Sequence, residues 1–177
     1  MRNYIFKSER LGFRNWIEED KIKMFIINSN PKVMEYFPTT LTQKQTDEFI
    51  TRMQTQYSKN GFCYFAVDKL ESNEFIGFIG IAEQTFKSDF TPCVDVGWRL
   101  AQSEWGKGFA TEGAKKCIEF AFNQIGLKNM KSICPETNNK SENVMKKIGM
   151  KKTKIFNHPL LSKFKKLEKC VLYEIEK

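Results

Sequence analysis

The spacing of apolar residues in the first third of the chain predicts one strand followed by helices. Apolar and polar residues alternate between Tyr4 and Trp16, with the two-residue period of a strand. Helical spacing follows over residues 18–29, 32–36 and 42–59. Thr42, three residues before Gln45, predicts a capping box at the start of the last helix, and Gly61 predicts its end.

Strand and helix patterns alternate through the rest of the chain. Strands are predicted at residues 62–68, 75–83, 92–100, 130–134, 150–156 and 171–176. Helices are predicted from Ala110 to Ile125, where Gly126 follows, and from Ser141 to Ile148, where Gly149 follows. With the opening strand this makes seven strands. We therefore expect an α+β (mixed α/β) fold, in which helices flank a mixed sheet.

Length and composition favour a single domain over residues 1–177. Hydrophobic residues make up 41% of the chain and include 16 Phe, which is enough for a substantial core. No apolar run approaches the roughly 20 residues that span a bilayer, and the first residues lack the apolar core of a signal peptide. We expect a cytoplasmic protein without a membrane partner.

The cysteines and the net charge limit which cofactors and partners the chain is expected to bind. The five cysteines are scattered and form no paired C-x-x-C motifs, so we expect reduced thiols, most of them buried, and no metal site. The net charge of +8 favours anionic partners such as a phosphorylated cofactor. Because the lysines are spread along the chain, a solvated basic surface accounts for them better than a nucleic-acid interface does.

One loop has the chemistry of an anion site. Trp105, Gly106, Lys107 and Gly108 lead into a helix that begins with Phe109, Ala110 and Thr111. A glycine turn before a helix exposes backbone N–H groups at the positive end of the helix dipole, and Lys107 adds charge there. The loop matches neither a P-loop nor the dinucleotide fingerprint. By itself the pattern leaves two interpretations open, an anion cradle or a purely structural turn.

The surrounding segments give that loop a family context. The segments Asp95–Leu100 and Trp105–Glu112 resemble motif A of the GCN5-related N-acetyltransferase (GNAT) family, in the variant of its RimJ/RimL-like branch. Residues 9–16 and 138–150 agree, so the resemblance covers nearly the whole chain. It implies the GNAT fold, with a central, mostly antiparallel sheet of about seven strands. Trp105 stands where the family usually has Gln or Arg.

The resemblance also implies how a cosubstrate is held. In the family the loop binds the pyrophosphate of acetyl-CoA through backbone N–H groups, here those from Gly106 to Thr111. The strand that carries Trp98 and Leu100 would pair with the pantetheine arm, and Asn138 would contact it from the other side. Ser141 would either cap its helix or contact the cofactor. No metal is implied.

Direct attack by a neutral amine needs a base and stabilisation of an oxyanion. The resemblance implies that a backbone N–H near Trp98 stabilises the oxyanion. Asp95 is our first candidate for the base, with a structural ion pair to Arg14 or Arg99 as the alternative, and Glu83 is the second candidate.

The sequence does not assign the general acid, the group that protonates the leaving thiolate. Met145 occupies the place where the family often has a Tyr that protonates the leaving thiolate. Ser141 is a substitute, or no acid is needed, because a thiol pKa of about 8.5 makes the thiolate a tolerable leaving group. His158 is the only histidine, and we interpret it as a hydrogen-bonded loop residue rather than a base.

The acceptor is the least determined feature. The branch resemblance favours the α-amine of a protein N-terminus, and a small-molecule amine (a polyamine, an antibiotic or an amino acid) is the alternative. A non-catalytic CoA-binding regulator and a nucleic-acid module are the competing classes. Either a monomer or a homodimer is compatible with the sequence. Four aromatic residues are candidates for the acceptor pocket or for the core: Trp16, Tyr36, Phe37 and Phe90.

Overall fold

Eight strands form one sheet in the computed structural model, which describes residues 3–177. The strand order is β1-β2-β3-β4-β5-β6-β8-β7, and every neighbouring pair is antiparallel except β5 and β6, which are parallel. The strands are β1 (Phe6–Lys7), β2 (Leu11–Arg14), β3 (Tyr64–Lys69), β4 (Phe75–Gln84), β5 (Cys93–Leu100), β6 (Asn129–Pro135), β7 (Lys151–Asn157) and β8 (Lys169–Glu176). The mixed α+β fold is therefore confirmed.

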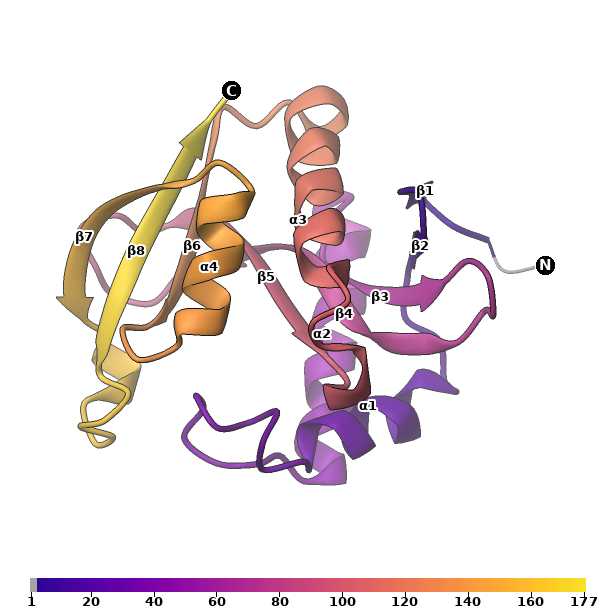
Figure 1. Cartoon of the computed structure of the whole chain (residues 1–177), viewed down its shortest axis with the longest axis horizontal. Coiled ribbons are helices and arrows are strands. Elements are labelled where there is room, and N and C mark those ends of the chain that lie inside the picture. Colours follow the sequence, from indigo (N-terminus) through magenta and orange to yellow (C-terminus); the bar gives the residue numbers. More distant parts are fainter. Residues whose placement is uncertain (1–2) are drawn as a thin grey trace.

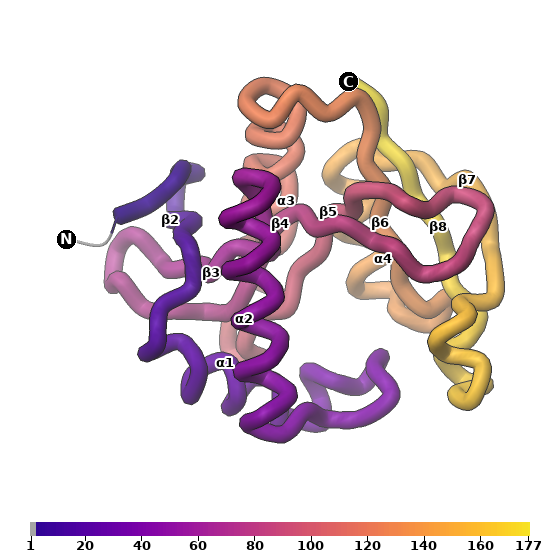
Figure 2. The backbone as a smooth tube through the Cα atoms, turned by 180° about the vertical axis from the view of Figure 1, so that it is seen from behind, coloured from indigo at the N-terminus to yellow at the C-terminus, as the bar shows by residue number. Residues whose placement is uncertain are grey.

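Helices cover both faces of this sheet. The α-helices are α1 (Asp20–Asn28), α2 (Gln43–Asn60), α3 (Phe109–Phe120) and α4 (Asn139–Lys147). Helices α3 and α4 lie in front of the sheet in Figure 1. Helices α1 and α2 lie on the opposite face, which is turned toward the viewer in Figure 2. Within residues 3–177, no helix is long and apolar enough to cross a membrane.

The N-terminal strand prediction needs a correction. The segment from Tyr4 to Trp16 is two short strands, β1 and β2, which pair antiparallel with each other. Their turn is tied to the helix layer, because the Ser8 hydroxyl and the Arg10 backbone N–H both donate to Glu112 at 2.7 and 2.8 Å. The sheet therefore has eight strands instead of seven. Glu112, which holds the turn between β1 and β2, is more than 100 residues away in sequence, so the local pattern does not contain this contact.

Four of the five predicted helices are confirmed, and one is wrong. Thr42 and Gln45 form the expected capping box of α2. Residues 32–36 are turns rather than a helix, and they form part of an irregular connection between α1 and α2. The predicted helix from Ala110 to Ile125 is α3 followed by a π-helical turn, Ala121–Ile125, and it ends at Gly126 as expected.

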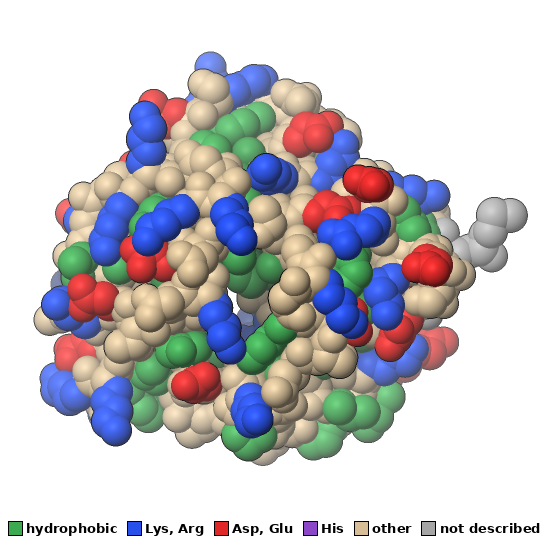
Figure 3. Space-filling model, viewed as in Figure 1, with side chains coloured by type: hydrophobic (Ala, Val, Ile, Leu, Met, Phe, Trp, Pro, Cys, Tyr) green, Lys and Arg blue, Asp and Glu red, His purple; other side chains and the backbone are tan. Residues whose placement is uncertain are grey.

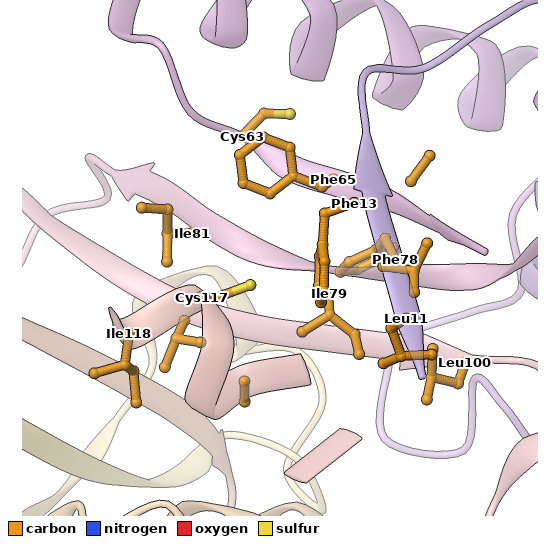
Figure 4. Close-up of a cluster of buried hydrophobic side chains, with 14 of the residues drawn as sticks. Leu11, Phe13, Cys63, Phe65, Phe78, Ile79, Ile81, Leu100, Cys117 and Ile118 are labelled. Carbon is orange, nitrogen blue, oxygen red and sulfur yellow. The ribbon is translucent and has the colours of Figure 1, made fainter. Parts of the chain in front are cut away.

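A continuous apolar core lies between the sheet and the helices. Its side chains include Leu11, Phe13, Phe65 and Ile79, each fully buried, and Figure 4 shows them with Cys117 of α3. Four of the five cysteines, Cys63, Cys117, Cys134 and Cys170, are buried free thiols. The core thus fixes α3 against β4 and β5, the strands that form one wall of the cavity described below.

One buried ion network holds the N-terminal part of the sheet to α1. The Arg14 guanidinium donates to Asp20 at 2.6 and 2.8 Å and to Asp68 at 2.7 and 2.9 Å. All three side chains are at most 4% exposed. Removing one partner from such a group leaves the others buried without their counter-charge.

We expect Arg14→Met to lower the free energy of unfolding by about 3–5 kcal/mol, because both carboxylates lose their cation. Urea unfolding at neutral pH measures this loss. Arg52→Met, at an exposed position on α2, is the matched control. Equal stability of the two variants would show that the network contributes little.

Candidate active site

The two halves of the sheet separate between β5 and β6. The parallel register joins Asp95 to Lys131, and the Ser132 hydroxyl donates to the Val96 carbonyl at 2.9 Å. A cavity of about 780 Å³ passes through this opening and is lined by residues from both faces of the sheet. In Figure 3 the surface is hollowed in this region, with Lys and Arg side chains around it.

The backbone of β5 presents polar groups to the opening. The Val96 carbonyl accepts from β6, so it points away from β4. Because backbone groups of alternate residues point to the same edge of a strand, the N–H and C=O of Trp98 point into the opening as well. Trp98 and Leu100 both line the cavity, as expected for a strand that holds an extended ligand.

The loop before α3 forms a cradle of backbone N–H groups. Gly106 and Gly108 have φ of 77° and 84°, in the left-handed region that glycine adopts without strain. Gly108 is the N-cap of α3, and no side chain among the described residues caps this helix. The first N–H groups of a helix have no partner within it, so those of Phe109, Ala110 and Thr111 remain available to an anion. Gly106 and residues 108–111 all line the cavity.

Arg10, near the N-terminus of the chain, holds this loop in place. Its Nη1 donates to the Lys107 carbonyl at 3.1 Å, and its Nε donates to Glu112 at 2.7 Å. The guanidinium also lies 4.5 Å from the centroid of the Phe109 ring. Sequence reasoning gave Arg10 no role beyond its place in a matching segment, because its partners are about 100 residues away.

Lys107 differs from the expected arrangement, and Lys140, which had no predicted role, lies at the cavity. The Lys107 ammonium lies 3.2 Å from Glu104 and does not line the cavity, so the structure does not place its charge beside the cradle. Lys140 does line the cavity, with its ammonium 4.5 Å from the centroid of the Trp105 ring. The Trp105 indole donates to the Leu100 carbonyl at 3.0 Å, which joins the loop to the end of β5.

Helix α4 supplies the opposite wall. Asn138 is its N-cap, and the Asn138 side chain accepts from the Ser141 backbone N–H at 3.1 Å. The prediction that Ser141 caps this helix is therefore wrong, because the helix begins earlier, at Asn139. Asn138, Ser141 and Met145 all line the cavity.

Asp95 lies in the cavity wall within a hydrogen-bonded group. Its Oδ1 accepts from the Tyr64 hydroxyl at 2.6 Å and from the Gln84 amide at 3.1 Å. Burial raises the pKa of Asp95 to about 6, although both hydrogen bonds act in the opposite direction. Burial, together with the Asp95 charge, holds the pKa of Tyr64 well above its usual value, so the hydroxyl stays a donor. A carboxylate of this kind can exchange protons near neutral pH.

The other predictions for acidic residues do not match the geometry. Asp95 pairs with neither Arg14 nor Arg99, because Arg14 is taken by Asp20 and Asp68 and Arg99 donates to Asn28. Glu83 is exposed and pairs in register with Val94, so it lies on the opposite face of the sheet from Asp95. The structure does not bring Glu83 to the cavity.

The far end of the cavity is largely aromatic. Tyr36 and Phe37 line it together with Phe49, Phe78 and Phe86. Of the four aromatic candidates, Trp16 is instead a core residue and Phe90 packs on Phe156, 5.0 Å between ring centroids. His158 lines the cavity beside Phe86, and its Nδ1 accepts from the Leu160 N–H at 3.3 Å. This fits the expected hydrogen-bonded loop histidine, and burial lowers its pKa, which disfavours the charged form.

Comparisons with known proteins identify the family. The family model for the acetyltransferase (GNAT) domain matches residues 10–151. YkkB of Bacillus subtilis is 26% identical over 144 residues, which cover 81% of this chain and 83% of that protein. The crystal structure of a GNAT-family acetyltransferase from Bacillus anthracis has a TM-score of 0.79 at 23% identity and covers 96% of both chains. RimL, described as a ribosomal L7/L12 alpha-N-protein acetyltransferase and solved with coenzyme A, has a TM-score of 0.77 at 13% identity and covers 98% of both chains. The chain therefore belongs to the GNAT family of N-acetyltransferases and is an acyltransferase.

Proposed function

We propose that this chain is a single acetyltransferase domain that transfers the acetyl group of acetyl-CoA to a primary amine, which enters from the Asp95 side of the cavity. The observation that supports this proposal most directly is that one cavity joins the N-terminus of α3, which no described side chain caps, to the buried Asp95 carboxylate. A cradle for phosphates and a group that accepts a proton thus open into the same space.

The residues present fit acetyl-CoA. A Cβ at Gly106 would meet no atom within 4 Å, so space is left beside the loop for a ligand, and the helix N-terminus presents unpaired N–H groups to an anion. The loop at 106–111 would hold the pyrophosphate, the edge of β5 at Trp98 and Leu100 would pair with the pantetheine arm, and Asn138 would contact that arm from α4. Acetyl-CoA supplies an activated thioester carbonyl when bound.

Each step needs one group of this chain. Asp95 takes the proton from the acceptor ammonium, directly or through a water molecule. The Trp98 backbone N–H, which points into the opening, donates to the oxygen on which negative charge develops. Met145 cannot donate a proton. The CoA thiolate therefore leaves unassisted, or it takes a proton from the hydroxyl of Ser141, which lines the cavity on α4 as Met145 does.

The protein N-terminal α-amine is our first choice of acceptor within this proposal. It is supported by the RimJ/RimL-like motif variant and by the similarity of fold to RimL. Small-molecule amines are the second choice, since one fold serves many acceptors.

Two measurements test the proposal. Acetyl-CoA should raise the melting temperature of the protein, and thiol release from acetyl-CoA should increase when amines are added. No shift at millimolar acetyl-CoA would refute the cosubstrate assignment. A shift without thiol release from any amine would favour a CoA-binding regulator.

Tyr64→Phe tests the environment of Asp95. Losing the 2.6 Å hydrogen bond removes an interaction that favours the carboxylate, so the pKa of Asp95 rises further above 6. We expect the acid limb of the kcat/KM profile to move to higher pH by about one pH unit, from the usual strength of a hydrogen bond to a charged group. A Tyr57→Phe variant, altered outside the cavity, controls for general effects. An unchanged limb would show that Asp95 does not set it.

A further inference from the structure

Arg99 places a half-buried cation in the wall of the cavity. Its Nη1 donates to the Asn28 side chain at 2.7 Å, and its guanidinium lies 4.1 Å from the centroid of Phe37 and 5.4 Å from that of Phe78. Its Nε is buried without a hydrogen-bond partner, and within residues 3–177 no carboxylate forms an ion pair with it. Among the described residues, Arg99 therefore contacts one amide and two aromatic rings.

This arrangement contrasts with that of Arg14, which is fully buried. Arg14 is held between two carboxylates, whereas Arg99 faces a cavity and pairs with no carboxylate of the described part of the chain. Burial lowers the pKa of Arg99 to about 10, so the group remains a cation at neutral pH. Because a partly desolvated charge without a partner is costly, an anion that enters the cavity and meets Arg99 gains more than it would at the surface.

Arg99 and Asp95 both line the cavity and lie on the same face of β5. They are four residues apart on β5, so their side chains leave the same face of the strand, with about 13 Å between their Cα atoms from the rise of an extended chain. The side chains of Trp98 and Leu100, the neighbours of Arg99 on β5, alternate to the other face. The acceptor half of the cavity therefore has a proton acceptor toward one end and a cation toward the other.

We propose that the acceptor is an amine that also carries a carboxylate, and that Arg99 binds this carboxylate and so determines specificity. This inference rests on the proposed acetyl transfer, because it places the acceptor amine at Asp95. Polyamines and aminoglycosides, which carry only positive charges, are disfavoured beside Arg99. A free amino acid and a peptide with an acidic first residue both supply the required chemistry.

Matched acids and amides test the proposal. The first set contains ω-amino acids with two to five methylenes and their primary amides. The second contains C-terminally amidated tetrapeptides that begin with Asp or Glu, each paired with its Asn or Gln counterpart. Binding is measured by thermal shift with acetyl-CoA present, and turnover by thiol release, for the wild type, Arg99→Gln, Arg99→Lys and the surface control Arg52→Gln.

We expect the wild type and Arg52→Gln to prefer at least one acid over its amide by about tenfold to a hundredfold in kcat/KM, the usual worth of a charged hydrogen bond. Arg99→Gln should lose this preference, Arg99→Lys should recover part of it, and the shift with acetyl-CoA alone should be unchanged in both. Which set shows the preference distinguishes a free amino acid from a peptide.

The outcomes separate the two proposals. Equal binding of acids and amides, or a preference for spermidine, would overturn the role of Arg99 even if acetyl transfer is observed. An acid-specific thermal shift that disappears in Arg99→Gln, without thiol release, would support the Arg99 site and refute acetyl transfer. A preference that survives in Arg99→Gln would assign carboxylate binding to another residue.

Discussion

Asp95→Asn is expected to lower kcat/KM roughly 100- to 10,000-fold, the usual contribution of a general base. The asparagine oxygen can still accept from Tyr64 and Gln84, so the variant removes the ionisation and keeps both hydrogen bonds. The rate of the wild type should rise with pH through a group of pKa about 6, and this limb should be absent in the variant. Steady-state thiol release across pH 5–9 measures both effects.

The same substitution is expected to stabilise the protein. The pKa of Asp95 is about 6 in the folded protein, against an ordinary value of 3.8, so the folded state binds the proton more tightly than the unfolded state. Wild-type stability is therefore lost as the pH rises from about 4 through 6. At pH 7 and above, Asp95→Asn should be more stable by up to about 3 kcal/mol, and the difference should disappear below pH 4.

Glu83→Gln is the matched control for Asp95→Asn. Glu83 is exposed on the other face of the sheet, so its loss should leave the rate and the pH profile nearly unchanged. If Glu83→Gln lowers kcat/KM strongly and Asp95→Asn lowers it little, Glu83 rather than Asp95 is the general base. Urea unfolding at pH 4, 6 and 8 completes the comparison.

Gly108→Val is expected to weaken acetyl-CoA binding by at least about a hundredfold. Gly108 has φ of 84° at the first turn of α3, and a β-branched side chain there forces the backbone to move. Its Cβ would also lie 3.4 Å from Arg10 Nη2, in the group that fixes the loop. Displacing two N–H groups from an anion, each worth about 1.5–3 kcal/mol, accounts for a loss of this size. Titration calorimetry with acetyl-CoA measures it.

Gly126→Val separates the loss of the cradle from the strain itself. Gly126 has φ of 82° at the end of the π-helical turn and does not line the cavity. Both variants should lose about 1–3 kcal/mol of stability from backbone strain. Only Gly108→Val should lose acetyl-CoA. If both variants bind acetyl-CoA as the wild type does, the loop does not hold the pyrophosphate.

Local sequence was enough for most of the elements and for the position of the loop. The capping box at Thr42 and the helix end at Gly126 depend on contacts within about four residues, so the pattern along the chain contains them. Likewise, Gly106 and Gly108 before a helix predict free N–H groups without reference to the rest of the molecule. The strand alternation from Cys93 to Leu100 is local too, and it placed β5 correctly.

The partners of each side chain were decided only by the tertiary structure. Asp95 meets Tyr64, 31 residues away, rather than an arginine, and Arg99 meets Asn28, 71 residues away. A strand's periodicity gives its two faces, but it does not give the neighbouring strands or the helix that packs on each face. Sequence thus gave the candidate residues for the chemistry of this acetyltransferase, such as Asp95 and the loop at 106–111. Packing against distant segments decided that burial raises the pKa of Asp95 to about 6 and that Arg99 pairs with no carboxylate among residues 3–177, because desolvation and ion pairing depend on the assembled core.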